Sequence, residues 1–263
     1  MRIATFNVLH GRSPHDGRVD GDRLAHAVRG LDADVLGLQE VDHAQPRSGL
    51  LDLTRIAADA LGAPAYRFAP AIVGTPGQRF RPWRHDGDGA GQPCYGVGLV
   101  SRWPVRSWQI TRLPAAPVRS PVYVPGAGLL LLRDEPRVVL AAVIDTPDGP
   151  LSVATTHLSF VPGWNLRQLR AAVRALRDLP APRLLIGDLN LPAAVARAVS
   201  GWQVLGRAAT YPSPRPRVQL DHVLADRRGS RALGPVTQVS TPTVEVSDHR
   251  PLVLRFARPP GRP

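Results

Sequence analysis

Six stretches of the sequence each place a residue that can bind a metal ion or move a proton at one end of an apolar, strand-like run. These residues are Asn7, Glu40, His157, Asp188, Asn190, Asp221, His222, Asp248 and His249. Ligand sites in sheet proteins gather at strand ends, because the sheet holds side chains rigidly there and the loops open to solvent. Carboxylates, amides and imidazoles at such positions suit phosphate chemistry assisted by a hard divalent ion.

Several of these residues also have a purely structural explanation when each is considered alone. Asn7 is consistent with a turn residue bonded to the backbone, and Glu40 with a solvated strand end. His157 is consistent with a satisfied core histidine. Asp248 beside His249 is equally consistent with a capping pair in a turn. The set as a whole favours chemistry, because six separate strand ends would otherwise carry such residues by chance.

Asp188 and Asp221 resist a structural explanation, because each carboxylate lies inside an apolar run. A buried carboxylate without a partner is costly, so each needs a cation, a metal or several hydrogen-bond donors. Mg²⁺ takes oxygen ligands and often needs only one or two carboxylates besides substrate phosphate and water. Glu40 can supply such a carboxylate, with Asn7 or Asp248 nearby. No cysteine is in the set, which argues against a structural zinc site.

Length and composition bound the class of protein. The chain has 263 residues, of which 43% are hydrophobic, and this is ample for a sizeable core. No stretch approaches about 20 apolar residues without a charge, so no transmembrane span and no stable membrane insertion are expected. The N-terminal residues lack the apolar segment and cleavage site of a secretory signal. The single cysteine, Cys94, cannot form an internal disulfide, so the expected location is a reducing cytoplasm.

The charge is strongly basic and comes entirely from arginine. The formal net charge is +12, and the sequence contains no lysine. Arginine suits phosphate because its planar fork donates two parallel hydrogen bonds, although a GC-rich genome gives the same composition. The residues 74–94 contain the group Arg79, Arg81, Trp83 and Arg84, which predicts stacking and phosphate contacts with a substrate. A solvated loop in an arginine-biased chain explains this group equally well.

Apolar, β-branched runs predict eight strands, which cover 2–9, 34–41, 95–103, 137–144, 150–158, 183–190, 218–225 and 250–256. Helical patterns predict four helices, at 20–30, 49–62, 164–179 and 192–200. Stretches rich in Gly, Pro or Arg predict loops at 74–94, 111–128 and 206–217. None of these loops is long enough to be a linker. We therefore expect one mixed α/β domain over 1–257 and a frayed tail over 258–263.

Taken together, the motifs resemble the endonuclease/exonuclease/phosphatase superfamily, which is also called DNase I-like. The motifs are TFNVLHG, LGLQEVD, GVGLVSRWP, ATTHL, IGDLNLP, LDHVLA and SDHRPL, in this order from Arg2 to Phe256. GDLN and SDHRP are good signals individually, and the resemblance covers nearly the whole chain. It implies a four-layer α/β/β/α sandwich, with two mostly antiparallel sheets facing each other and the site at one end.

The resemblance also implies a role for each position. Glu40 would be the principal Mg²⁺ ligand with Asn7 beside it, and Mn²⁺ is an alternative ion. Asp188 and Asn190 would hold and activate the attacking water. His249 would bind the scissile phosphate, and Asp221 would orient His249. Asp248 would support the metal or His249. His157 would be a second histidine in contact with phosphate.

Three classes of function stay open at this stage. The first is a Mg²⁺-dependent phosphoester hydrolase acting as a phosphodiesterase or nuclease, or as a phosphatase or phosphodiesterase on inositol phosphates, phospholipids or other small phosphoesters. Repair of abasic DNA is disfavoured, since the THL histidine at 157 stands where that branch usually has a tyrosine. The second is a non-catalytic nucleic-acid-binding protein, and the third is a zinc hydrolase, whose ligand spacing is absent. A monomer is expected, and the stretch 210–221 is expected to form another rim of the site.

Overall fold

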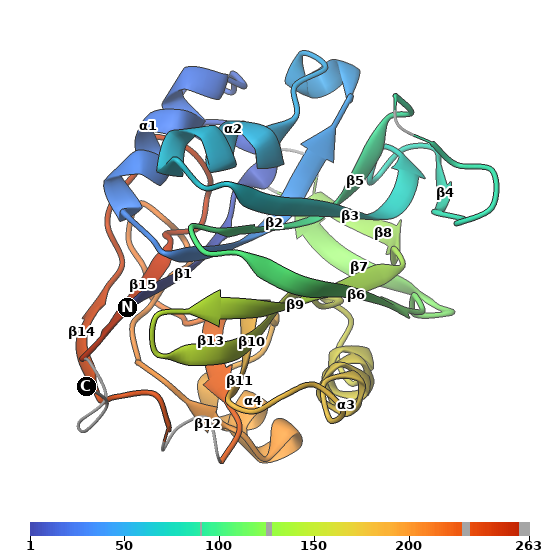
Figure 1. The fold of residues 1–263 in the computed structure, drawn as a ribbon. Coiled ribbons are helices and arrows are strands. Elements are labelled where there is room, and N and C mark those ends of the chain that lie inside the picture. The colour runs from blue at the N-terminus through green and yellow to red at the C-terminus, as the bar shows by residue number, and fades with distance from the viewer. Residues whose placement is uncertain (90, 125–127, 228–231, 258–263) are drawn as a thin grey trace.

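The computed structural model describes residues 1–89, 91–124, 128–227 and 232–257, and within them it contains two large sheets that face each other (Figure 1). The first sheet has the strand order β14 (Val236–Ser240), β15 (Leu252–Phe256), β1 (Arg2–Asn7), β2 (Val35–His43), β5 (Cys94–Ser101), β3 (Ala65–Gly74) and β4 (Phe80–Pro82). The second has the order β12 (Gln203–Val204), β13 (Asp221–Ala225), β11 (Arg183–Asp188), β10 (Gly149–His157), β9 (Arg137–Thr146) and β6 (Val105–Leu113). A separate hairpin joins β7 (Arg119–Val124) to β8 (Gly128–Arg133).

Helices cover the outer faces of both sheets, which gives four layers. The helices α1 (Gly21–Leu31) and α2 (Leu53–Leu61) pack on the first sheet, and α3 (Trp164–Ala175) and α4 (Ala193–Ser200) pack on the second (Figure 1). The central core between the sheets is apolar and includes Ile3, Leu140, Ile186 and Leu254, all fully buried. The expected α/β/β/α sandwich of mostly antiparallel sheets is confirmed.

Each large sheet contains one parallel pair of strands in an otherwise antiparallel arrangement. In the first sheet β1 runs parallel to β2, and in the second β10 runs parallel to β11. The chain connects the members of each pair through a helix, as parallel strands require a crossover. Because parallel strands end at the same edge, the polar residues that follow them are brought together there.

The predicted strands and helices are present with shifted bounds. The predicted helix at 49–62 is shorter: a 3₁₀ turn at Pro46–Ser48 precedes it, and α2 itself covers Leu53–Leu61. The helix predicted over 164–179 ends at Ala175, because Arg177 and Leu179 donate to the third residue before them and tighten the chain into turns. The region 206–217 contains no helix or strand in the described structure, as expected.

Two of the predicted loops contain strands. The short strand β4 lies within 74–94, and β7 and the end of β6 lie within 111–128. The strands β3, β6 and β14 were also not predicted, because they are partly exposed and mix polar with apolar residues. The tail predicted as frayed, 258–263, lies outside the described residues. The assignment of 1–257 to one domain stays a prediction.

Candidate active site

The two parallel strand pairs place the predicted residues at one edge of the sandwich. The register of β1 and β2 sets Asn7 opposite Gln39, the residue before Glu40. In the second sheet, His157 at the end of β10 lies opposite Asp188 at the end of β11. Asp188 in turn lies opposite Asp221, the first residue of β13. Residues 181 positions apart in sequence therefore meet, as the hydrogen bond from Asn7 to Asp188 shows.

Gly187 allows β10 and β11 to approach closely just before the site. Its φ of +145° is a conformation that side chains rarely adopt, and a Cβ there would collide with the carbonyl oxygen of Thr156. Glycine is therefore required at the position that directly precedes Asp188. This explains why the motif IGDLN has glycine within an otherwise apolar strand.

Glu40 and Asn7 form a hydrogen-bonded group that also includes Asp188. The Asn7 side-chain amide donates to Glu40 Oε1 at 3.0 Å and to Asp188 Oδ2 at 3.0 Å. Glu40 has a φ of +54° and lies at a register shift between β2 and β5. This bulge turns the carboxylate out of the regular strand pattern, and such bulges often redirect a side chain beside an active site. Burial, and the nearby Asp248 carboxylate, raise the pKa of Glu40 to about 7.

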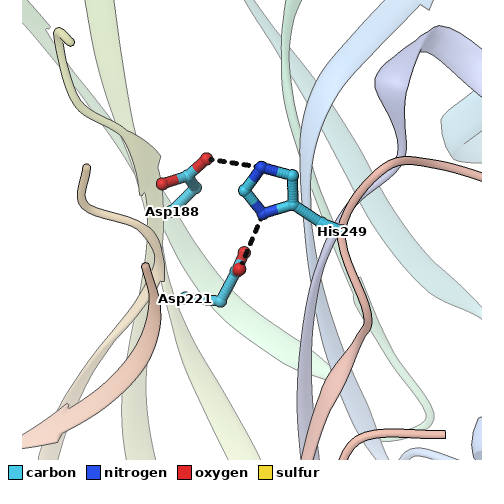
Figure 2. Close-up of side chains that lie close together, drawn as sticks. All are labelled: Asp188, Asp221 and His249. Carbon is cyan, nitrogen blue, oxygen red and sulfur yellow. Dashed lines mark hydrogen bonds and ion pairs between the residues drawn. The ribbon is translucent and has the colours of Figure 1, made fainter. Parts of the chain in front are cut away.

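His249 and Asp221 form a buried imidazole–carboxylate pair. His249 Nδ1 lies 2.8 Å from Asp221 Oδ2, and Nε2 on the other side of the ring lies 3.7 Å from Asp188 Oδ2 (Figure 2). Burial alone would lower the pKa of His249, but Asp221, Asp188 and Asp248 together raise it to about 10. The imidazole is therefore held in its charged form, with one N–H on Asp221 and the other directed at the Asp188 side.

Asp188 is the carboxylate at the centre of the group. Its Oδ1 accepts the backbone N–H of Asn190 at 2.9 Å, and its Oδ2 accepts the Asn7 amide. Burial raises the pKa of Asp188 to about 6, and the charge of His249 opposes that rise. A carboxylate with a pKa in this range can accept a proton near neutral pH.

His157 differs from His249 in its charge. Asn190 Nδ2 lies 3.2 Å from His157 Nε2, and it also donates to the Leu158 carbonyl oxygen at 2.9 Å. His157 Nδ1 is buried and has no hydrogen-bond partner. Burial, and the positive charges of Arg137 and His249, hold the pKa of His157 well below its usual range. His157 is thus a neutral imidazole with one unused nitrogen.

Asp248 contributes a second carboxylate on the Glu40 side. Its Oδ1 is buried and has no hydrogen-bond partner, and its charge acts on both Glu40 and His249. Two carboxylates whose charges act on each other, one with a buried oxygen that has no hydrogen-bond partner in the described part of the chain, repel each other unless a cation lies between them. With the Asn7 amide beside them, these oxygen donors fit a hard divalent ion.

A second group of residues is also close enough to hold a metal. Donor atoms of Asp188, Asp221 and His249 all lie within 4.8 Å of one another, and all three residues are buried (Figure 2). In this group His249 Nδ1 is already bonded to Asp221. Asp221 Oδ1, like Asp248 Oδ1 in the Glu40–Asp248 group, is buried and has no hydrogen-bond partner among the described residues, so each group leaves one carboxylate oxygen unsatisfied.

Neighbouring residues that were not predicted as site residues hold the group in place. Ser247 Oγ donates to the Asn7 carbonyl oxygen at 2.6 Å and accepts the His249 N–H at 3.0 Å. The Tyr211 ring lies 4.8 Å from the His249 ring, and Thr210 Oγ1 accepts the backbone N–H of Asp221. The stretch 210–221 was thus expected at the rim and does contact the site. Ser247 gave no signal, since a serine in a turn is common.

The predicted arginine group does not act as a unit. Arg81 pairs with Asp88 through both of its terminal nitrogens, and Arg84 donates its backbone N–H to the same carboxylate. Trp83 is half-buried, and its backbone N–H donates to the Ala71 carbonyl oxygen. Arg79 is exposed and lies apart from this ion pair, in a cleft described below. His222, also at a strand end, is fully buried and bonded to the Leu191 carbonyl oxygen, which is a structural role.

A comparison of the sequence with models of protein families identifies the family of this chain. The model of the endonuclease/exonuclease/phosphatase family matches residues 4–249. The chain belongs to this family. The matched span includes every residue of the group described above. The comparison with curated proteins gives no significant match.

Solved structures of related fold agree with this membership. An endonuclease/exonuclease/phosphatase from Beutenbergia cavernae is 24% identical, with a TM-score of 0.71 over 98% of this chain and 72% of that one. A mannosyl-6-phosphatase from Bacteroides thetaiotaomicron is 17% identical, with a TM-score of 0.62 over 98% and 100% of the two chains. Sphingomyelinase C from Streptomyces griseocarneus is 18% identical, with a TM-score of 0.60 over 98% and 99%. At these identities the similarity establishes the fold, and family membership makes the chain a phosphoester hydrolase by class.

Among the described residues, no helix is long and apolar enough to cross a membrane. The cytoplasmic location and the monomeric state stay predictions.

Proposed function

We propose that this family member is a Mg²⁺-dependent phosphodiesterase of the nuclease type, which hydrolyses its substrate by in-line attack of water. One observation carries the proposal: a charged His249, oriented by Asp221, faces Asp188 beside the oxygen donors of Asn7, Glu40 and Asp248. Phosphoryl transfer needs a positioned water, neutralised phosphate oxygens and little else from the protein. Each need has a candidate side chain in this group.

Glu40 and Asp248, with Asn7 beside them, are the residues that would hold the ion. When bound, Mg²⁺ or Mn²⁺ supplies Lewis-acid stabilisation of a phosphate oxygen. Asn7 has a further task, because its amide bonds both Glu40 and Asp188 and so fixes the distance between the two carboxylates.

Asp188 and Asn190 are the candidates for orienting and activating water. The backbone N–H of Asn190 and the Asn7 amide fix the Asp188 carboxylate from both sides. Its pKa of about 6 allows it to be ionised at neutral pH and still to accept a proton from water. The Asn190 side chain is itself fixed by the Leu158 carbonyl oxygen and His157.

The two histidines would bind the phosphate in different ways. His249 carries a positive charge that Asp221 stabilises, so it can neutralise charge that develops on a phosphate oxygen. His157 is neutral and can offer only a hydrogen bond. Electrostatic stabilisation of this kind usually provides the largest share of catalysis, so His249 is the more important of the two.

A phosphatase or phosphodiesterase acting on small phosphoesters or phospholipids is the second candidate. It is supported by relatives of the same fold that are named mannosyl-6-phosphatase and sphingomyelinase C. The same catalytic group serves either substrate, since it addresses the phosphate and leaves the rest of the substrate to the rim. A protein that only binds nucleic acid is disfavoured, because it would not need the complete group.

The first test is incubation of purified protein with supercoiled plasmid in Mg²⁺, with an EDTA control and the His249→Ala variant. Nicking that depends on metal and disappears in the variant supports a nuclease. If the plasmid stays supercoiled while inositol phosphates or sphingomyelin are hydrolysed, the second candidate replaces the first. Binding of DNA without turnover of any phosphoester would overturn both.

A further inference from the structure

A cleft of about 400 Å³ between the β3–β4 turn and the β7–β8 hairpin is lined by three arginines. Arg79 comes from the turn, and Arg119 and Arg133 come from the hairpin, where they are opposite each other in the register. All three side chains are exposed. Phe80 and Leu131 also line the cleft, and the Leu131 side chain is 64% exposed at its rim.

The backbone places these arginines rather than leaving them on free loops. The β3–β4 turn closes tightly, because the Thr75 N–H donates to the Arg79 carbonyl oxygen at 3.2 Å. Gly74, with a φ of +97°, makes this possible, since a Cβ would collide with that same oxygen. On the other side, the pairing of Arg119 with Arg133 closes the base of the hairpin. Two separate elements therefore aim guanidinium groups into one cleft.

The three arginines have no counter-ion among the described residues. Arg81, two positions from Arg79, is paired with Asp88, but no ion pair involves Arg79, Arg119 or Arg133 in the part of the chain that is described. The Arg133 guanidinium lies 5.8 Å from the centre of the Phe80 ring. A flat guanidinium resting on an aromatic ring is a surface on which a nucleic-acid base can stack. Three unpaired positive charges repel one another unless an anion joins them.

Chain connections place this cleft at the catalytic end of the sandwich. The turn follows the end of β3, where the backbone N–H of Gly74 donates to the Pro93 carbonyl oxygen. The next residue, Cys94, begins β5 and lies opposite His43, the last residue of β2. Glu40 lies three residues before His43 on β2. On the hairpin side, Glu135 lies two residues after Arg133, and its charge acts on the same Tyr95 as that of Glu40. The cleft and the Glu40 group thus share neighbours.

We propose that this three-arginine cleft binds the phosphates of a single-stranded nucleic-acid substrate at a distance from the scissile bond. The inference rests on the proposed nuclease function and names its substrate. A concave, positively charged cleft that also offers a stacking surface suits a flexible strand, in which every nucleotide brings both a phosphate and a base. A lipid surface would meet the exposed Leu131 but would leave the concave part of the cleft unused.

The test measures binding separately from cleavage. A 5′-fluorescein-labelled oligothymidylate of about twelve nucleotides is titrated by anisotropy in EDTA over a range of salt concentrations. Single variants and the triple variant Arg79→Gln/Arg119→Gln/Arg133→Gln are compared with the double variant Arg197→Gln/Arg207→Gln. The control arginines are also exposed and line a different cleft, between α4 and β12. All of these positions are exposed, so the folded state should persist, and circular dichroism checks this.

We expect the triple variant to bind the oligonucleotide at least about tenfold more weakly, with the slope of log K against log salt reduced by about two. The control variant should retain most of the wild-type affinity and slope. Unchanged binding and slope in the folded triple variant, or an equal loss in the control, would overturn the inference. If the triple variant lost binding to vesicles of phosphatidylcholine and phosphatidylserine but bound the oligonucleotide as the wild type does, the cleft would bind a membrane. That result would also overturn the inference. Plasmid nicking decides the proposed function independently, because the binding assay involves no turnover.

Discussion

The proposed catalytic group and the three-arginine cleft lie at the same end of the molecule but are built in opposite ways. In the catalytic group, Asp188, Asp221 and His249 are each no more than 6% exposed and are bonded to one another or to the backbone. In the cleft, Arg79, Arg119 and Arg133 are exposed and unpaired within the described residues. The first region is a fixed network that folding itself assembles, and the second is a set of charges that water screens.

This difference predicts how each region responds to change. Removing one member of a buried network leaves its partners without hydrogen bonds. The loss of activity is therefore large, and the effects of separate substitutions are not additive. Removing one exposed arginine takes away one of several charges that the solvent already screens. The loss of binding affinity is therefore small and depends on the salt concentration. The predictions that follow test this contrast, beginning with the largest effect.

The His249→Ala substitution should reduce kcat on the order of 10³-fold with a small change in KM, because it removes the charge that faces the phosphate. The measurement is steady-state hydrolysis of plasmid or of bis(p-nitrophenyl) phosphate in saturating Mg²⁺. His26→Ala, at an exposed histidine of α1, is the matched control and should keep wild-type rates. A decrease of less than tenfold in the folded His249 variant would mean that the buried network is not the catalytic centre.

The His157→Ala substitution should cost less, about 10²-fold, since a neutral imidazole can contribute only one hydrogen bond. His157→Asn should recover part of the rate, because an amide can also donate a hydrogen bond. Single-turnover rates for both variants test this order. Equal losses for the His157 and His249 variants would contradict the distinction drawn between a neutral and a charged histidine.

The activity should rise by about tenfold per pH unit below pH 6 and fall above pH 10, with a plateau between. The acid limb follows from Asp188, whose pKa is raised to about 6, because below that pH it is protonated and cannot accept a proton. The alkaline limb follows from His249, whose pKa is raised to about 10, because above that pH it loses its charge. In His249→Ala the alkaline limb should disappear from kcat measured with saturating metal. An alkaline limb that persists would assign it to another group.

The Arg81→Gln substitution should leave the activity unchanged and lower the melting temperature only slightly. Arg81 is about half exposed, whereas the Asp88 side chain is only 3% exposed; Asp88 keeps the backbone N–H of Arg84, and the shorter Gln side chain retains a hydrogen-bond donor. Salt-dependent oligonucleotide binding should also stay close to wild type, in contrast to the Arg79 variant. A weakening equal to that of Arg79→Gln would mean that the whole of 74–94 binds substrate, as the sequence suggested.

The buried region was more predictable from the sequence than the exposed one, for a physical reason. A carboxylate inside an apolar run, as at Asp188 and Asp221, requires compensation wherever it folds, so it marks a site even without a structure. The strands that carry these residues are apolar nearly throughout and were found for the same reason. Both parallel pairs then follow from helical crossovers, which bring the strand ends to one edge.

The exposed region could not be predicted in the same way. An arginine on a surface costs little in any arrangement, so its sequence neighbours do not reveal its partners. Arg79 and Arg81 are two residues apart, yet one lies in an arginine cleft and the other forms an ion pair. Arg119 and Arg133 gave no signal, because β7 lies in the stretch 111–128, which was read as a loop, and β8 was not predicted as a strand. Ser247 and Tyr211 belong with these, since only the fold sets them against His249.

The amide of Asn7 has a consequence for how the protein unfolds. It bonds Glu40 on its own sheet and Asp188 on the facing sheet, so one side chain joins the two halves of the sandwich. A partly unfolded chain with either sheet displaced would lose this bridge and the catalytic geometry together. Activity is therefore a direct report of cooperative folding: in denaturant it should vanish at the midpoint at which the two sheets separate, with no active intermediate before it.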